Sequence, residues 1–125
     1  MKWGSLILVL FGAACDPGVR VEFLVNATDD STAQASAQIA DALAQRHGLG
    51  SQPLDSSCDL ASYHVKSAPT RWWDFCVDQR GQNVSLVLEE WITTDWSPKG
   101  DSLQRELEDT LRIRFGDRVT RHDYP

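Results

Sequence analysis

The sequence predicts an α+β domain over residues 19–125, with an antiparallel sheet and two helices on one of its faces. Three observations indicate this class. Apolar and polar residues largely alternate in residues 19–25, which is the period of a half-buried strand. Residues 71–78 and 83–92 are strand-like and flank a polar turn. Apolar residues recur at every fourth position in residues 103–115, as on the buried face of a helix.

A helix-capping sequence follows the first strand. Asp29-Asp30-Ser31-Thr32 provides an N-cap side chain and negative charge where a helix would begin. We expect this helix to run to about His47, with an alanine-rich face that can lie close to a sheet. Gly48 is expected to end it, because glycine readily adopts the left-handed conformation of a helix C-terminus.

Residues 49–70 have no clear period. Gly50, Pro53 and Pro69 interrupt the segment, and residues 60–65 are compatible with a short strand. A structureless segment of this length is unusual in a compact domain. We therefore expect an irregular but ordered segment, pinned by a disulfide at Cys58.

The strands 71–78 and 83–92 predict a hairpin whose turn is Gln79–Gln82. Pairing Asp78 with Asn83 sets the expected register, in which Trp73, Phe75 and Val77 lie opposite Leu88, Leu86 and Val84 on the core face. The other face then carries Trp72, Asp74, Cys76, Ser85, Val87, Glu89 and Trp91.

The last helix has two alternative starts, Ser97-Pro98 and Asp101-Ser102, and Gly116 is expected to end it. A polar strand over residues 118–123 follows. The resulting order of strand, helix, irregular segment, strand, strand, helix and strand is that of the ferredoxin-like βαββαβ plait. Many functions use that fold, so it does not by itself indicate an activity.

The start of the chain has the pattern of an export signal. Lys2 precedes an unbroken apolar run over residues 6–11, and the small residues Gly12-Ala13-Ala14 lead directly to Cys15. This arrangement resembles the lipobox of bacterial lipoproteins. The resemblance covers residues 1–15 and departs from the family pattern at Gly12, where leucine is usual.

The resemblance implies a cleaved signal peptide over residues 1–14 and a lipidated tether over residues 15–18, with a diacylglycerol on Cys15 as the membrane anchor. It also implies a location in the bacterial cell envelope, facing the periplasm. Asp16 resembles the enteric signal that retains a lipoprotein in the inner membrane. The same small residues suit an ordinary signal peptidase, which leaves simple secretion as an alternative.

Charge and cysteine content narrow the function classes. The formal net charge is −6, and removal of Lys2 would make the remainder more acidic, which argues against nucleic acid as a partner. If Cys15 carries lipid, Cys58 and Cys76 remain, and in an oxidising compartment they are expected to form a disulfide. We expect no metal site, because the sequence lacks CxxC and HxxxH spacings, and no cofactor.

Tryptophans outside the core are the candidate binding surface, because exposed tryptophan often marks a contact site. The binding-surface candidates are Trp72, Val87, Glu89, Trp91 and Trp96. The alternative is that the disulfide-tied segment covers this face with Leu60 and Tyr63. Each of the three histidines, His47, His64 and His122, has an ordinary structural role as its simpler interpretation.

The sequence therefore supports a membrane-tethered domain that binds another envelope protein. Two other hypotheses remain open. One is a small envelope enzyme that uses Asp74, Glu89 and a histidine, because paired carboxylates beside aromatic residues are typical of sugar-cleaving sites. The other is a purely structural lipoprotein. No residue is assigned as catalytic, since neither a GxSxG motif nor a glycine-rich phosphate loop is present.

Overall fold

The computed structural model describes residues 18–27, 29–54, 58–68, 71–91 and 93–124, with the backbone alone at 65–68, 71 and 72. The predictions of a signal peptide, of lipid on Cys15 and of a role for Asp16 therefore lie outside the described residues. The elements are β1 (Gly18–Asn26), α2 (Asp30–His47), β2 (Gly50–Ser51), β3 (Ala61–Ala68), β4 (Arg71–Arg80), β5 (Asn83–Trp91), α3 (Pro98–Phe115), the 3-10 turn η1 (Gly116–Arg118) and β6 (Val119–Tyr124).

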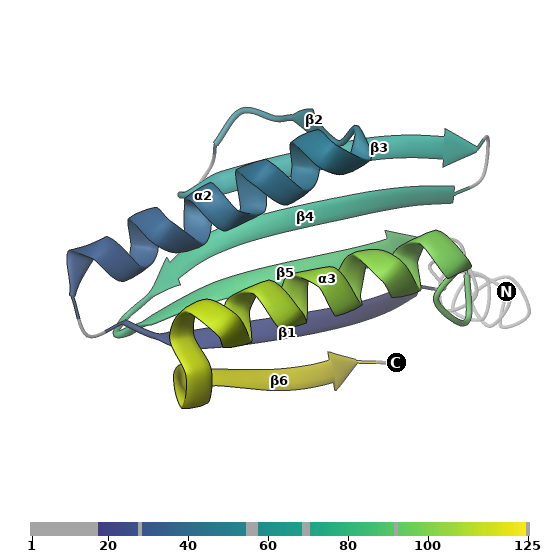
Figure 1. Cartoon of the computed structure of the whole chain (residues 1–125). Coiled ribbons are helices and arrows are strands. Elements are labelled where there is room, and N and C mark those ends of the chain that lie inside the picture. The colour runs from purple at the N-terminus through teal and green to yellow at the C-terminus, as the bar shows by residue number, and fades with distance from the viewer. Residues whose placement is uncertain (1–17, 28, 55–57, 69–70, 92, 125) are drawn as a thin grey trace, which may run out of the picture.

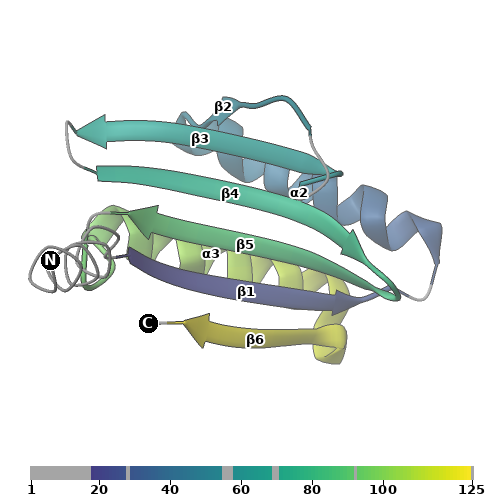
Figure 2. The same cartoon turned by 180° about the vertical axis from the view of Figure 1, so that it is seen from behind.

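The strands form one six-stranded antiparallel sheet in the order β2-β3-β4-β5-β1-β6. Both helices cover the same face of the sheet (Figure 1), and none of the described residues forms a helix on the opposite face (Figure 2). The predicted α+β class is confirmed. The strand β3 agrees with the short strand that residues 60–65 allowed, whereas β2 was not predicted. Together they extend the sheet at one edge.

The first strand and helix form as the sequence predicts. Val21, Phe23 and Val25 are fully buried against the helices. At the start of α2 the Asp29 carboxylate accepts a hydrogen bond from the Thr32 amide at 3.2 Å. Gly48 ends the helix with φ of 71°, a left-handed conformation that glycine adopts without steric penalty.

The hairpin between β4 and β5 has a different register from the expected one. Arg80, not Asp78, lies opposite Asn83, so the turn has two residues and begins at Gly81, whose φ is +59°. The error is a slip of two positions. Side chains alternate with a period of two, so every residue keeps its predicted face but changes its cross-strand neighbour. Trp73, for example, lies opposite Glu90.

The last helix begins at the first of its two predicted starts. The Ser97 hydroxyl accepts a hydrogen bond from the Gly100 amide at 3.1 Å. The carboxylate of Glu90, which is fully buried, accepts a hydrogen bond from the Ser97 amide at 2.9 Å. This hydrogen bond anchors the start of α3 on the end of β5.

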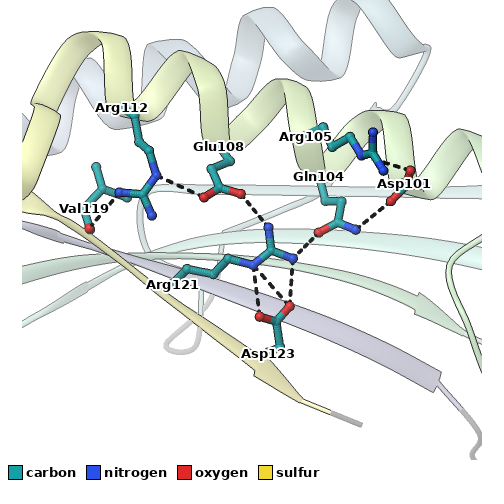
Figure 3. A network of polar contacts seen from close by, with 8 residues as sticks. All are labelled: Asp101, Gln104, Arg105, Glu108, Arg112, Val119, Arg121 and Asp123. Carbon is teal, nitrogen blue, oxygen red and sulfur yellow. Dashed lines mark hydrogen bonds and ion pairs between the residues drawn. The ribbon is translucent and has the colours of Figure 1, made fainter.

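The edge strand β6 is attached to α3 by a polar network around Arg121 (Figure 3). The guanidinium donates to Glu108 at 2.5 Å and pairs with Asp123 on its own strand at 2.8 Å. It also lies 5.6 Å from the ring centre of Phe23 and so covers the end of the core. These contacts lie on the helix-covered face, and we interpret them as structural.

Candidate functional site

The helix-free side of the sheet, called the open face below, carries a line of polar side chains across neighbouring strands. The strand register aligns His64 on β3, Asp74 on β4, Glu89 on β5, Arg20 on β1 and Tyr124 on β6. Directly opposed residues have Cβ atoms roughly 4.5–5.5 Å apart. We call these five residues the polar row. They come from five strands, so no stretch of sequence contains the site.

Asp74 contacts two neighbouring side chains through its two carboxylate oxygens. One carboxylate oxygen lies within hydrogen-bond distance of His64 Nδ1. The other accepts a hydrogen bond from the indole Nε1 of Trp91 at 2.7 Å. A carboxylate that contacts Nδ1 fixes the orientation of an imidazole, and the indole fixes the carboxylate in turn. The three side chains are therefore held in one arrangement.

Glu89 differs electrostatically from Asp74. Burial raises the pKa of the Glu89 carboxyl above its ordinary value, because a low-dielectric environment disfavours the charged form. The positive charge of Arg20 acts to lower this pKa, and the negative charge of Asp74 acts to raise it further. The result is a carboxyl that holds its proton more tightly than usual, next to a second carboxylate.

Glu22 lies beside the polar row and links β1 to neighbouring strands on the open face. It accepts hydrogen bonds from Ser85 at 2.6 Å and from the Tyr124 hydroxyl at 3.1 Å, and Arg80 lies 3.5 Å away. Burial acts to raise the Glu22 pKa, but these partners outweigh it and the pKa is lowered. Arg20 lies over the Tyr124 ring at 4.4 Å.

The open face is hollowed at the polar row. The hollow has a volume of about 490 Å³, and it is lined by Arg20, His64, Asp74, Arg80, Val87 and Glu89, among others. Cys58 and Cys76 also line it. Val87 gives the hollow an apolar floor, whereas cationic and anionic side chains surround it.

The predicted disulfide between Cys58 and Cys76 is confirmed, with the two Cα atoms 5.3 Å apart. It joins the segment before β3 to the middle of β4. Two backbone contacts reinforce the junction: the Leu60 amide donates to the Val77 carbonyl at 3.0 Å, and the Gln79 amide donates to the Asp59 carboxylate at 2.9 Å.

The expected cover over the open face is not formed by Leu60 and Tyr63. The Tyr63 side chain is buried on the helix side, where its hydroxyl donates to Asp41 of α2 at 3.2 Å. Leu60 is partly buried and packs against the same core. In the described part of the chain, these two residues therefore leave the hollow accessible.

The predicted surface residues fall in different places. Val87, Glu89 and Trp91 are all partly buried on or beside the hollow. The backbone of Trp72 pairs with that of Trp91, but its side chain lies outside the described residues. Trp96 packs against the core beside the start of α3 instead of joining the polar row.

The three histidines are also separated. His64 belongs to the polar row, whereas His47 contacts Glu106 at 3.1 Å at the end of α2. His122 is exposed on β6 and pairs with Glu22 along the strand register. The structure thus brings one histidine to the carboxylates that the sequence singled out.

The sequence interpretation did not select Arg20, Glu22, Arg80 or Tyr124. The alternation in β1 could have indicated Arg20 and Glu22, because it places both on the face of the strand that does not carry Val21 and Phe23. Tyr124 gave no such signal, since its neighbours belong to a strand at the other end of the sequence.

Comparison with known proteins finds no family model and no curated protein that matches the chain. Within the described ranges, no group of three potential metal-binding side chains occurs, and no helix is long and apolar enough to cross a membrane.

Proposed function

We propose that this chain is a lipid-anchored extracytoplasmic domain that binds another protein of the bacterial envelope through its open face. The observation that carries the proposal is that the helices cover one side of the sheet, while the hollowed side presents the polar row and Trp91. Tryptophan and arginine are the side chains that most often dominate protein interfaces.

The charges favour a protein partner over a small apolar ligand. Arg20 and Arg80 border the same hollow as Asp74 and Glu89, so both signs of charge meet over the apolar Val87. A protein surface can match such a mixed pattern with complementary charges, which provides specificity and register. The hollow is also broad and open, unlike the enclosed sites that bury a small molecule.

The proposed location is supported by two features. The export pattern with Cys15 resembles a lipoprotein signal, and the Cys58–Cys76 disulfide suits an oxidising compartment such as the periplasm. The lipid on Cys15 would hold the domain at the membrane, and Asp16 favours the inner membrane by its resemblance to the enteric retention signal.

For the fold, we propose a ferredoxin-like plait enlarged at one edge. The strands β1, β4, β5 and β6, with α2 and α3, would form the βαββαβ unit, and β2 and β3 would be additions between α2 and β4. This relation is consistent with the order β4-β5-β1-β6 of these four strands in the sheet.

The interface is tested by photo-crosslinking in the native host. A photoreactive residue at Val87, in the hollow, should give a discrete crosslinked species. The same residue at Ile113, which is 88% exposed on α3, serves as the control and should give none. Equal crosslinking at both positions, or none at Val87, would contradict the proposal and favour a purely structural lipoprotein.

A second candidate is acid–base catalysis on a sugar, favoured by the contact of His64 with Asp74 and by the raised Glu89 pKa beside it. Hydrolysis of chromogenic glycosides by the purified chain would test it. Activity should be lost in Glu89→Gln and kept in Asp78→Asn, a carboxylate of β4 outside the polar row. Absence of turnover on every glycoside tried would leave the binding function preferred.

A further inference from the structure

The two ends of the sheet differ in chemistry. We call one of them the tether end: it comprises the starts of β1, β4 and α3 and the ends of β5 and β6, which lie together (Figures 1 and 2). Gly18 pairs there with Trp91, and Arg20 pairs with Tyr124. Trp96 and Lys99 flank the start of α3.

Aromatic side chains are concentrated at the tether end. The tryptophans after Cys15 all lie within two residues of an element terminus at this end: Trp72 and Trp73 at the start of β4, Trp91 at the end of β5 and Trp96 before α3. Trp91 and Trp96 are partly buried, and Tyr124 is 38% exposed. Lys99 is exposed and lies 5.2 Å over the ring of Trp73.

The opposite end, called the far end, is polar. Its exposed positions come from the end of β1, the start of α2 and the β4–β5 turn. They include Asn26, Asp29, Asp30, Ser31, Gln79, Arg80, Gly81 and Gln82. The two ends of the sheet therefore differ in the type of side chain that they carry, aromatic at the tether end and polar at the far end.

We propose that the tether end rests in the headgroup layer of the membrane, so that the sheet stands upright with the far end directed into the periplasm. This inference rests on the proposed lipid at Cys15. The chain from Cys15 to Gly18 spans about 10 Å at full extension, because each residue contributes at most ~3.3–3.6 Å. The start of β1 must then lie close to the lipid.

The side chains at the tether end suit that position. Tryptophan and tyrosine are enriched at membrane–water interfaces, where a ring meets the acyl boundary and a polar atom stays hydrated or bonded. The Trp91 Nε1 already donates to Asp74, so its ring can enter the interface without leaving an unpaired donor. Asp95 is exposed nearby, so the attraction comes from the aromatic rings and not from net positive charge.

The test uses the full-length chain, matured in a bacterial host and reconstituted in phosphatidylcholine vesicles. Intact mass first establishes the acyl groups. Tryptophan emission is then compared between vesicles with brominated and with ordinary acyl chains. Because all tryptophans of the mature chain lie at the tether end, brominated lipid should cause a loss of emission.

Ile113→Trp is the matched control. Ile113 is 88% exposed and lies about 22 Å along α3 from Pro98, at ~1.5 Å per residue. The extra emission of this variant should persist in brominated vesicles. Acylated protein whose emission is unaffected, or a variant whose extra emission is lost as well, would overturn the upright orientation. A chain without acyl mass would overturn the proposed function and the orientation together.

Discussion

Breaking the Cys58–Cys76 disulfide should destabilise the domain by about 3 kcal/mol. The bond closes a loop over a sequence separation of 18 residues, and loop-closure entropy for that length in the unfolded chain gives this magnitude at 25 °C. For a domain of about this size, each kcal/mol shifts the midpoint of thermal unfolding by roughly 4–8 °C. The expected decrease is therefore roughly 12–24 °C.

Circular dichroism melts of the chain with and without reductant provide the assay, with thiol titration to establish that the bond is open. The double variant Cys58→Ser/Cys76→Ser is the control. It should unfold near the midpoint of the reduced wild-type protein and should not respond to reductant. Both forms should refold, because the Leu60 and Gln79 amides still hold the junction with β4.

An unchanged midpoint in fully reduced protein would refute the reasoning. It would mean that the contacts around Leu60 and Gln79 restrict the chain as much as the covalent bond does. A sensitivity to reductant that persists in the double variant would instead show that the measured effect does not arise from this disulfide.

Two further predictions concern single side chains. Gly100→Ala should destabilise the domain by about 1–3 kcal/mol in urea unfolding, because the new Cβ would lie 2.3 Å from Glu90 Oε1. Gly50→Ala is the control: its new Cβ would have its nearest neighbour at an ordinary 3.5 Å, so the free energy of unfolding should change little. Glu89→Gln should raise the melting midpoint at pH 7 but not below pH 4. The raised pKa of the Glu89 carboxyl contributes stability that is present below the ordinary value of 4.5 and is lost as the pH rises through the folded pKa. The neutral glutamine avoids that loss. Equal shifts at both pH values would contradict the assigned burial.

Much of the fold could be predicted because the pattern of apolar and polar residues along the chain has the same period as the helix or strand that it forms. The helix α2 was predicted at its correct bounds from the capping sequence at Asp29 and from Gly48. β3 was indicated only as a possible short strand over residues 60–65, and β2 was not predicted, because a two-residue strand leaves no alternation to detect. β2 is defined only by its pairing with β3, and β3 by its pairing with β4.

The candidate site was predicted in part for the same reason. Alternation placed Asp74 and Glu89 on one face, and the two-residue error in register left that face unchanged. Trp96 was misplaced, because it lies between elements, where no period indicates the direction of a side chain. The role of Tyr63 was also wrong, because its strand could not be oriented without its partner.

The sequence by itself determined which side chains share a face and where helices begin and end, because these follow from periods of 2.0 and 3.6 residues and from capping chemistry. It also determined the disulfide, since lipid on Cys15 would leave one pair of cysteines. Only the tertiary structure decided that His64, Asp74, Glu89, Arg20 and Tyr124 form one row. The physical reason is that register between strands distant in sequence is set by packing against α2 and α3, which no local pattern records.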